Sequence, residues 1–129
     1  MIKNELLAIV ILVFVVAILL GCNTPKHTDH TIITQDEAMY MMANQDVIIL
    51  DVRTLSEFNL GHIPGAISLE LNEIRYVALY VIPDVNKTIL VYCRSGARSA
   101  YASAILTEMG YHNVYDFGGI INWTGEIQN

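Results

Sequence analysis

Apolar residues gather in short runs that are separated by polar and helix-forming segments over most of the chain. Residues 47–50 are a continuous apolar run followed by Asp51, and residues 89–92 are a second run followed by Cys93. Continuous runs of this length predict strands of a parallel sheet that are buried on both faces. Two shorter segments, 66–69 and 114–115, predict further strands.

Two helices are predicted from local capping signals. Thr34 with Glu37, and Thr54 with Glu57, each match the T-x-x-E capping box. In this motif the threonine hydroxyl and the glutamate three residues later satisfy each other's backbone N–H groups. One helix therefore starts after Thr34 and runs through Met42, and a short one starts after Thr54.

Two more helices are predicted from apolar spacing and from the residues that end them. Residues 72–81 place apolar side chains on one face of a helix, as far as Val81. Residues 99–109 predict an Ala-rich helix with Ser99 as its N-cap and with Gly110 after its end.

Strands and helices alternate in this order, which is typical of βα units. The sequence therefore predicts an α/β fold with a central, mostly parallel sheet of about five strands and helices on both faces. Ligands of such sheets bind beyond the carboxyl ends of the strands. Asp51 and Cys93 each lie at the carboxyl end of a predicted strand, so we expect both at that edge of the sheet.

The N-terminus has the composition of an export signal. Lys3 precedes an almost unbroken apolar run over residues 6–20, and residues 19–22 read L-L-G-C. A basic start, an apolar core and small residues at a cleavage point are the parts of such a signal. The ending resembles a bacterial lipobox, which implies cleavage before Cys22 and lipidation of its thiol.

This interpretation divides the chain into three parts. We assign residues 1–21 to a lipoprotein-type signal peptide, 22–31 to the lipidated Cys22 and a polar spacer, and 32–129 to one domain. The domain is then exported and anchored to a membrane on the extracytoplasmic side, at the cell surface or in the periplasm. The alternative is an uncleaved membrane helix, since the stretch from Leu6 to Cys22 just reaches the ~17 residues that a span requires.

Charge and cysteine content narrow the function classes. The net charge of −6 argues against a nucleic-acid partner. A disulfide between the two cysteines, Cys22 and Cys93, is conceivable in an oxidising compartment, but lipidation of Cys22 would leave Cys93 as a lone thiol. No C-x-x-C motif or spaced His pair is present, so no metal is expected, and His27 and His30 are interpreted as solvated spacer residues.

Cys93 begins a short loop between a predicted strand and a predicted helix. Unpaired backbone N–H groups and the positive end of the helix dipole converge at such a position. A free cysteine with a pKa of ~8.5 is mostly protonated at neutral pH, but a helix N-terminus and neighbouring arginines lower that value. Arg94 and Arg98 supply these cations and present planar forks to an anionic substrate. The loop is therefore predicted to hold a nucleophilic thiolate and an anion.

Four segments of the chain resemble sequence motifs of the rhodaneses, a family of sulfurtransferases. They are residues 51–53 (D-V-R) with Glu57 following, 61–66 (G-H-I-P-G-A), 93–99 (C-R-S-G-A-R-S) and 118–120 (G-G-I) followed by Trp123. They occur in family order and cover roughly residues 32–127. The resemblance implies a rhodanese-like fold and a single catalytic cysteine, with no cofactor.

The resemblance also implies the reaction. Cys93 would take a sulfane sulfur from a small anionic donor and pass it, as a persulfide, to cyanide, a thiol or a protein. A basic residue at Arg94 goes with thiosulfate as the donor in this family. The remaining loop residues, which would bind the substrate with Arg94, are Ser95, Gly96, Ala97, Arg98 and Ser99.

Three residues outside the loop are candidates for supporting roles. Asp51 is interpreted as anchoring the loop backbone or pairing with an arginine, because a carboxylate near a sheet edge is normally paired. Arg53 is expected in the same network or exposed to solvent. His62 is an acid/base candidate, but glycine and proline neighbours in a rigid turn favour a packing role with a hydrogen bond.

Other functions remain open from the sequence. A membrane-tethered persulfide carrier with little turnover of free thiosulfate would use the same loop. A phosphatase or arsenate reductase is disfavoured, because Cys93 and Arg98 enclose four residues where the related phosphatases have five. A redox sensor is disfavoured because lipidation of Cys22 would leave no resolving thiol.

Overall fold

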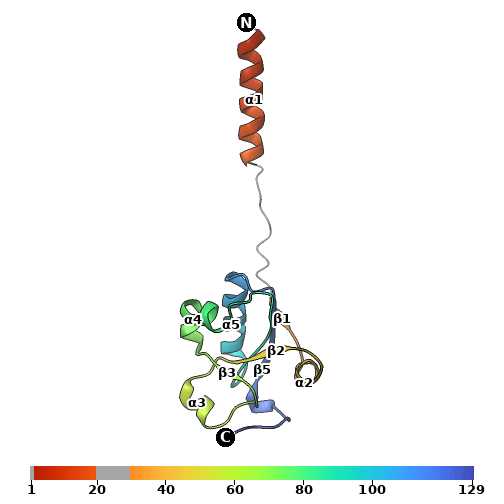
Figure 1. Ribbon diagram of the computed structural model, residues 1–129, viewed down its shortest axis with the longest axis vertical. Helices are drawn as coiled ribbons and strands as arrows, with labels where there is room; N and C mark the ends of the chain where they lie inside the picture. The colour runs from red at the N-terminus through yellow and green to blue at the C-terminus, as the bar shows by residue number, and fades with distance from the viewer. Residues whose placement is uncertain (1, 20–29) are drawn as a thin grey trace.

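The sheet of this protein has five strands, all parallel. The computed structural model (Figure 1) describes residues 2–19 and 30–129. The strand order is β1-β5-β4-β2-β3. The strands are β1 (Thr31–Ile32), β2 (Val47–Asp51), β3 (Ile67–Ser68), β4 (Thr88–Cys93) and β5 (Asn113–Gly119). The predicted α/β fold, with a mostly parallel sheet of about five strands, is confirmed.

Helices cover both faces of the sheet. They are α2 (Gln35–Asn44), α3 (Leu55–Asn59), α4 (Ile74–Val81) and α5 (Ala97–Glu108), with 3₁₀ turns η1 (Leu71–Glu73) and η2 (Ile120–Asn122). Side chains of the central strand β4 alternate between two hydrophobic cores. Ile89, Val91 and Cys93 belong to the core that α4 and α5 cover, and Leu90 and Tyr92 to the core that α2 covers. Cys93, the candidate nucleophile, is therefore the last residue of a strand that is buried on both faces.

Helix α1 (Ile2–Leu19) covers the apolar run of the predicted signal peptide. None of the helices that the structure describes reaches the length and hydropathy that a membrane span requires. Cys22 lies outside the described residues, so its lipidation stays a prediction.

The described chain resumes at the end of the predicted spacer. Thr31 pairs with Tyr115 of β5, so the sheet includes one residue that the sequence assigned to the spacer. The interpretation of His30 as a solvated residue is wrong: its side chain is largely buried, and its Nε2 lies 3.9 Å from the Asp116 carboxylate. Pairing of β1 with β5 brings His30 to that carboxylate. His27 lies outside the described residues.

Both predicted capping boxes form. Thr34 caps α2 and Thr54 caps α3, and in each box the threonine hydroxyl accepts the glutamate N–H while the glutamate carboxylate accepts the threonine N–H. Helix α3 has only five residues, so its cap secures most of its first turn.

Helix α5 begins at Ala97, two residues before the predicted start. Its N-cap is Gly96, so the prediction of Ser99 as the N-cap is wrong. Gly96 has a φ of +107°, a left-handed value that glycine adopts without steric cost. This conformation lets the chain pass from β4 into α5 within a few residues. Ser99 falls inside the helix, where its hydroxyl donates to the Gly96 carbonyl at 3.0 Å.

The segment predicted as one helix over 72–81 is divided between η1 and α4. Val81, predicted on the buried side, is exposed, and Ile82 occupies the core instead. Ile82 still donates its N–H to the Ala78 carbonyl, at 2.7 Å, but its backbone has left the helical conformation, which turns its side chain inward.

The end of β5 lies directly against the loop that follows β4. A side-chain carbon at Gly119 would overlap the backbone of Arg94 and Ser95. The Arg94 carbonyl also accepts the Ile121 N–H at 3.1 Å, just beyond Gly119. The absence of a side chain at Gly119 therefore allows the two backbones to approach closely, and this contact supports the loop from one side.

Substituting Gly119→Ala tests this contact. The clash is with main-chain atoms, which cannot rotate away, so we expect a loss of unfolding free energy of ~1–3 kcal/mol or more, as for overpacked sites. Urea denaturation measures it. Gly119 has an extended backbone with a φ of −121°, which alanine adopts without strain, so the loss reports the clash and not a conformational cost. A Gly119→Ala protein as stable as the wild type would show that the contact is absent.

Candidate active site

Cys93 is the last residue of β4 and is 1% exposed. Its Sγ accepts the backbone N–H of Gly96 at 3.0 Å. The register between β4 and β5 is irregular here, since Val91 pairs with Asp116 and Cys93 with Gly119. The thiol thus sits at the carboxyl edge of the sheet, under the loop that leads into α5, where the sequence predicted it.

The loop lowers the pKa of this thiol. Burial raises the pKa of Cys93, but hydrogen-bonding groups of Ser99, Gly96 and Ser95 outweigh burial, so the pKa lies below its ordinary value. The Ser99 hydroxyl donates to the Gly96 carbonyl at 3.0 Å, so its proton is engaged there. We therefore assign the stabilisation of the thiolate mainly to the main-chain N–H groups of Ser95, Gly96 and Ser99. A buried sulfur can carry negative charge here because donors already point at it.

The main-chain N–H groups of Ser95, Gly96 and Ser99 form what we call the sulfur cradle. The other loop residues surround it. Arg94 and Ser95 are exposed, and Ala97 opens α5. Within the described residues, no hydrogen bond or ion pair engages the Arg94 guanidinium, so Arg94 is available to an anion at the loop.

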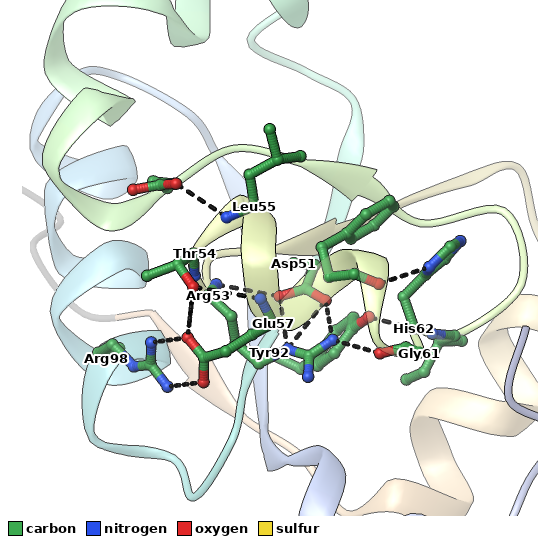
Figure 2. Close-up of polar contacts among 12 residues, drawn as sticks. Asp51, Arg53, Thr54, Leu55, Glu57, Gly61, His62, Tyr92 and Arg98 are labelled. Carbon is green, nitrogen blue, oxygen red and sulfur yellow. Dashed lines mark hydrogen bonds and ion pairs between the residues drawn. The ribbon is translucent and has the colours of Figure 1, made fainter. Parts of the chain in front are cut away.

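Arg98 forms an ion pair that the sequence did not predict. Its guanidinium binds both carboxylate oxygens of Glu57, Nη1 to Oε2 at 2.7 Å and Nη2 to Oε1 at 2.9 Å (Figure 2). Arg98 lowers the pKa of Glu57 to about 2, with the Thr54 cap contributing in the same direction. The sequence predicts both arginines as cations for the thiolate and the substrate anion, and the charge of Arg98 does interact with Cys93 in addition to Glu57. Of the two arginines, Arg94 has no partner among the described residues, because the bidentate Glu57 carboxylate binds Arg98.

Asp51 and Arg53 form a buried ion pair next to the loop. The Asp51 carboxylate accepts the Arg53 backbone N–H at 3.0 Å and the Arg53 Nη2–H at 2.7 Å (Figure 2). Arg53 also donates to the Gly61 carbonyl at 2.7 Å and lies over the Tyr92 ring, 5.7 Å from its centroid. Asp51 therefore both anchors backbone and pairs with an arginine, and the pair joins the end of β2 to the loop after α3.

His62 packs within its own loop. Its Nδ1 lies 3.0 Å from the Phe58 carbonyl, and its ring stacks on the Phe58 ring with centroids 3.7 Å apart. Its backbone exchanges hydrogen bonds with Gln128. These contacts give His62 the packing role that its rigid turn favoured.

A hollow of about 340 Å³ opens beside the loop. The residues that line it are Arg53, Glu57, Leu60, Gly61, Arg94, Ile120 and Ile121. The volume falls at the lower end of the range for small-molecule sites, ~300–1,000 Å³. Among the described residues, no group of three or more histidine, cysteine or acidic side chains could hold a metal ion.

Two residues of this arrangement were not assigned a role at the site from the sequence. Glu57 was interpreted as a capping residue, and its pairing with Arg98 crosses 41 positions of the chain, which no local pattern reports. Tyr92 was interpreted only as part of an apolar strand, but its hydroxyl accepts the Ile63 N–H at 3.1 Å. The position of Glu57 just after the end of β2, at the same sheet edge as Cys93, was the available signal.

Comparisons with known proteins agree with this arrangement. The family model described as Rhodanese-like domain matches residues 34–126. The thiosulfate sulfurtransferase PspE of Escherichia coli (strain K12) is 39% identical over 71 residues, which are 55% of this chain and 68% of the relative. A sulfurtransferase of Allochromatium vinosum is 41% identical over 80 residues, 61% of this chain and 73% of the relative.

The fold comparison gives the same result. A solved structure described as rhodanese with anions from E. coli matches with a TM-score of 0.62 and 33% identity, and covers 65% of this chain and 99% of that chain. The match of the family model covers more than half of the chain, and two relatives above 30% identity are covered over two thirds of their length or more. The chain therefore belongs to the rhodanese-like domain family.

Proposed function

We propose that this domain transfers a sulfane sulfur from thiosulfate, or a similar small anionic donor, to a thiophilic acceptor through a persulfide on Cys93. The observation that carries the proposal is the buried Cys93 Sγ, whose pKa is lowered by main-chain donors of the following loop. Family membership and the sulfurtransferase relatives support sulfur transfer as the general activity.

The reaction consists of two displacements. In the first, the Cys93 thiolate attacks the outer sulfur of thiosulfate, the S–S bond of the donor breaks, and sulfite leaves with the bonding electron pair. In the second, an acceptor such as cyanide attacks the terminal persulfide sulfur, forms thiocyanate and returns the thiolate. Charge balances in both steps without a proton, so the site needs no general base. The loop N–H groups can hold both the thiolate and the persulfide anion.

The charges at the site support an anionic donor. Asp51 neutralises Arg53, and Glu57 neutralises Arg98, so Arg94, which also lines the hollow, is the arginine there whose charge no carboxylate of the described residues neutralises. A planar guanidinium fits the sulfonate-like oxygens of thiosulfate. We assign donor binding to Arg94 and to the loop N–H groups.

A persulfide carrier is the second candidate. Leu60 and Ile121 line the hollow and are 84% and 62% exposed, which suits contact with a partner surface better than capture of a small inorganic anion. We also propose, from residues 1–22 alone, that the domain is exported and tethered to a membrane by Cys22. Fast labelling of Cys93 by a protein persulfide, with slow turnover of thiosulfate, would favour the carrier.

Mass spectrometry tests the persulfide directly. Incubation with thiosulfate should add about 32 Da, the mass of one sulfur atom, to the wild-type protein. The Cys93→Ser protein should gain nothing, because it lacks the attacking thiolate. Absence of the adduct from a folded wild-type protein would contradict the proposed reaction.

Substituting Arg94→Ala should weaken donor binding. We expect KM for thiosulfate to rise about 10-fold, which corresponds to ~1.4 kcal/mol of lost interaction with the anion. Arg75→Ala is the matched control, since Arg75 lies on α4 and pairs with Glu108. Equal KM values for the two variants would show that Arg94 does not bind the donor.

The rate of alkylation of Cys93 should depend on pH with a midpoint below ~8.5, the value of a free thiol. The folded pKa of Cys93 is lowered, so the reactive thiolate persists to lower pH than in an unfolded chain, and reactivity falls as pH drops through the folded value. Iodoacetamide kinetics in buffer and in denaturant give the two midpoints. A midpoint in buffer at or above the one in denaturant would contradict the role assigned to the loop donors.

A further inference from the structure

The two capping boxes of this protein are equal in their local bonds but differ in one long-range contact. In the first, Glu37 Oε2 accepts the Thr34 N–H at 2.7 Å and the Thr34 hydroxyl at 2.9 Å. In the second, Glu57 Oε2 accepts the Thr54 N–H and hydroxyl, both at 3.0 Å. Glu57 alone of the two also binds an arginine, through both of its oxygens. The second box therefore does more than cap a helix.

Arg98 connects this carboxylate to the sulfur cradle. It is the second residue of α5, between Ala97 and Ser99, in the turn whose N-cap, Gly96, donates to the Cys93 Sγ. A bidentate pair fixes both the position and the plane of the guanidinium. Holding Arg98 thus holds the first turn of α5 at the angle that aims its N–H groups at the sulfur.

The carboxylate is itself held in place. Leu55, the first residue of α3, donates its N–H to Glu70 at 2.8 Å, which ties the start of α3 to the chain that follows β3 (Figure 2). The Thr54 cap then orients Glu57, and Glu57 reaches Arg98. A continuous set of hydrogen bonds joins the β2–β3 side of the sheet to the nucleophile loop.

The structure assigns Glu57 as a positioning residue that acts through Arg98 to orient the sulfur cradle and to keep Arg98 away from the donor anion. The inference rests on the proposed function, because it assigns a further residue to the same site. The two loop arginines then have different roles: Arg98 orients the loop, and Arg94 binds the anion.

Substituting Glu57→Gln distinguishes a positioning role from a purely electrostatic one, because the two predict opposite changes in the pKa of Cys93. Removal of a negative charge beside Arg98 would by itself stabilise the thiolate and lower the pKa of Cys93. Loss of the held geometry withdraws N–H donors and raises that pKa. We therefore expect the alkylation midpoint of Cys93 to move to higher pH, and kcat for thiosulfate to fall about 10- to 100-fold, as for a misplaced reacting group. A midpoint that stays or moves to lower pH would overturn the assignment.

Glu37→Gln is the matched control. It makes the same loss of charge in the capping box of α2, where the glutamine oxygen can still accept the threonine N–H, and it touches no part of the loop. We expect at most a small decrease in Tm, with both the alkylation midpoint and kcat unchanged. Equal midpoint shifts in the two variants would mean that a weakened helix cap explains the effect, which would overturn the role of Arg98.

A double substitution tests the route through Arg98. If Glu57 acts only by holding Arg98, the protein with both Glu57→Gln and Arg98→Gln should lose no more kcat than Arg98→Gln alone. If the fold-losses of kcat in the two single variants multiply in the double variant, Glu57 does not act through Arg98, and the assignment is overturned. If Glu57→Gln does not fold by circular dichroism, Arg98→Lys provides the same comparison, because it keeps the charge but not the bidentate geometry. An unchanged midpoint in folded Arg98→Lys would then contradict the assignment.

The alkylation measurement needs no sulfur donor. A wild-type protein that forms no persulfide would defeat the proposed function, while the midpoints of Glu57→Gln and Glu37→Gln would still decide the role of Glu57. The two proposals can therefore fail independently.

Discussion

The chemistry of this site depends on main-chain N–H groups that converge on one buried sulfur. Cys93 is almost fully shielded from solvent, and a charge in that place is costly unless fixed donors replace water. The left-handed Gly96 starts α5 immediately after the loop, which brings the donors of its first turn back over the Sγ. The pairing of β4 with β5 fixes the start of the loop, and the contact of Gly119 with the Arg94 and Ser95 backbone fixes the loop itself.

Around this cradle the side-chain charges are mostly paired. Asp51 neutralises Arg53 in the interior, and Glu57 neutralises Arg98 at the edge. Buried or half-buried pairs of this kind are weak sources of stability, but they fix orientation because a partner left alone would be costly. Among the described residues, the pairing leaves the Arg94 guanidinium without a carboxylate partner, and the proposed function assigns the binding of the donor anion to Arg94 for this reason.

Local patterns in the sequence predicted most of the fold. The apolar runs at 47–50 and 89–92 became β2 and β4, and both T-x-x-E motifs became caps, because these features depend on neighbouring residues. Strand β1 was not predicted, since two residues at a sheet edge have no periodicity to detect. Ser99 was predicted as the N-cap because serine favours that position, but the positive φ available to Gly96 placed the start of α5 earlier.

The sequence predicted which residues lie together at the carboxyl edge of the sheet, but not which residues they contact. The motif at 93–99 indicates a thiol, two arginines and a turn, and cannot indicate that Arg98 meets a carboxylate 41 positions away. Such a pairing arises only when parallel strands bring their carboxyl ends together, so it belongs to the topology of the sheet. The same limit applies to His30, whose burial follows from the pairing of β1 with β5.

In the proposed reaction, burial of the nucleophile and access of an acceptor are compatible because a persulfide is longer than a thiolate. A sulfur–sulfur bond adds about 2 Å beyond the Cys93 Sγ. The negative charge is on Sγ in the thiolate and on the outer sulfur in the persulfide, and the loop N–H groups would hold each in turn. The acceptor would then attack the outer sulfur, which lies farther from the buried Sγ position, and the thiolate that leaves is the one for which the loop is already organised.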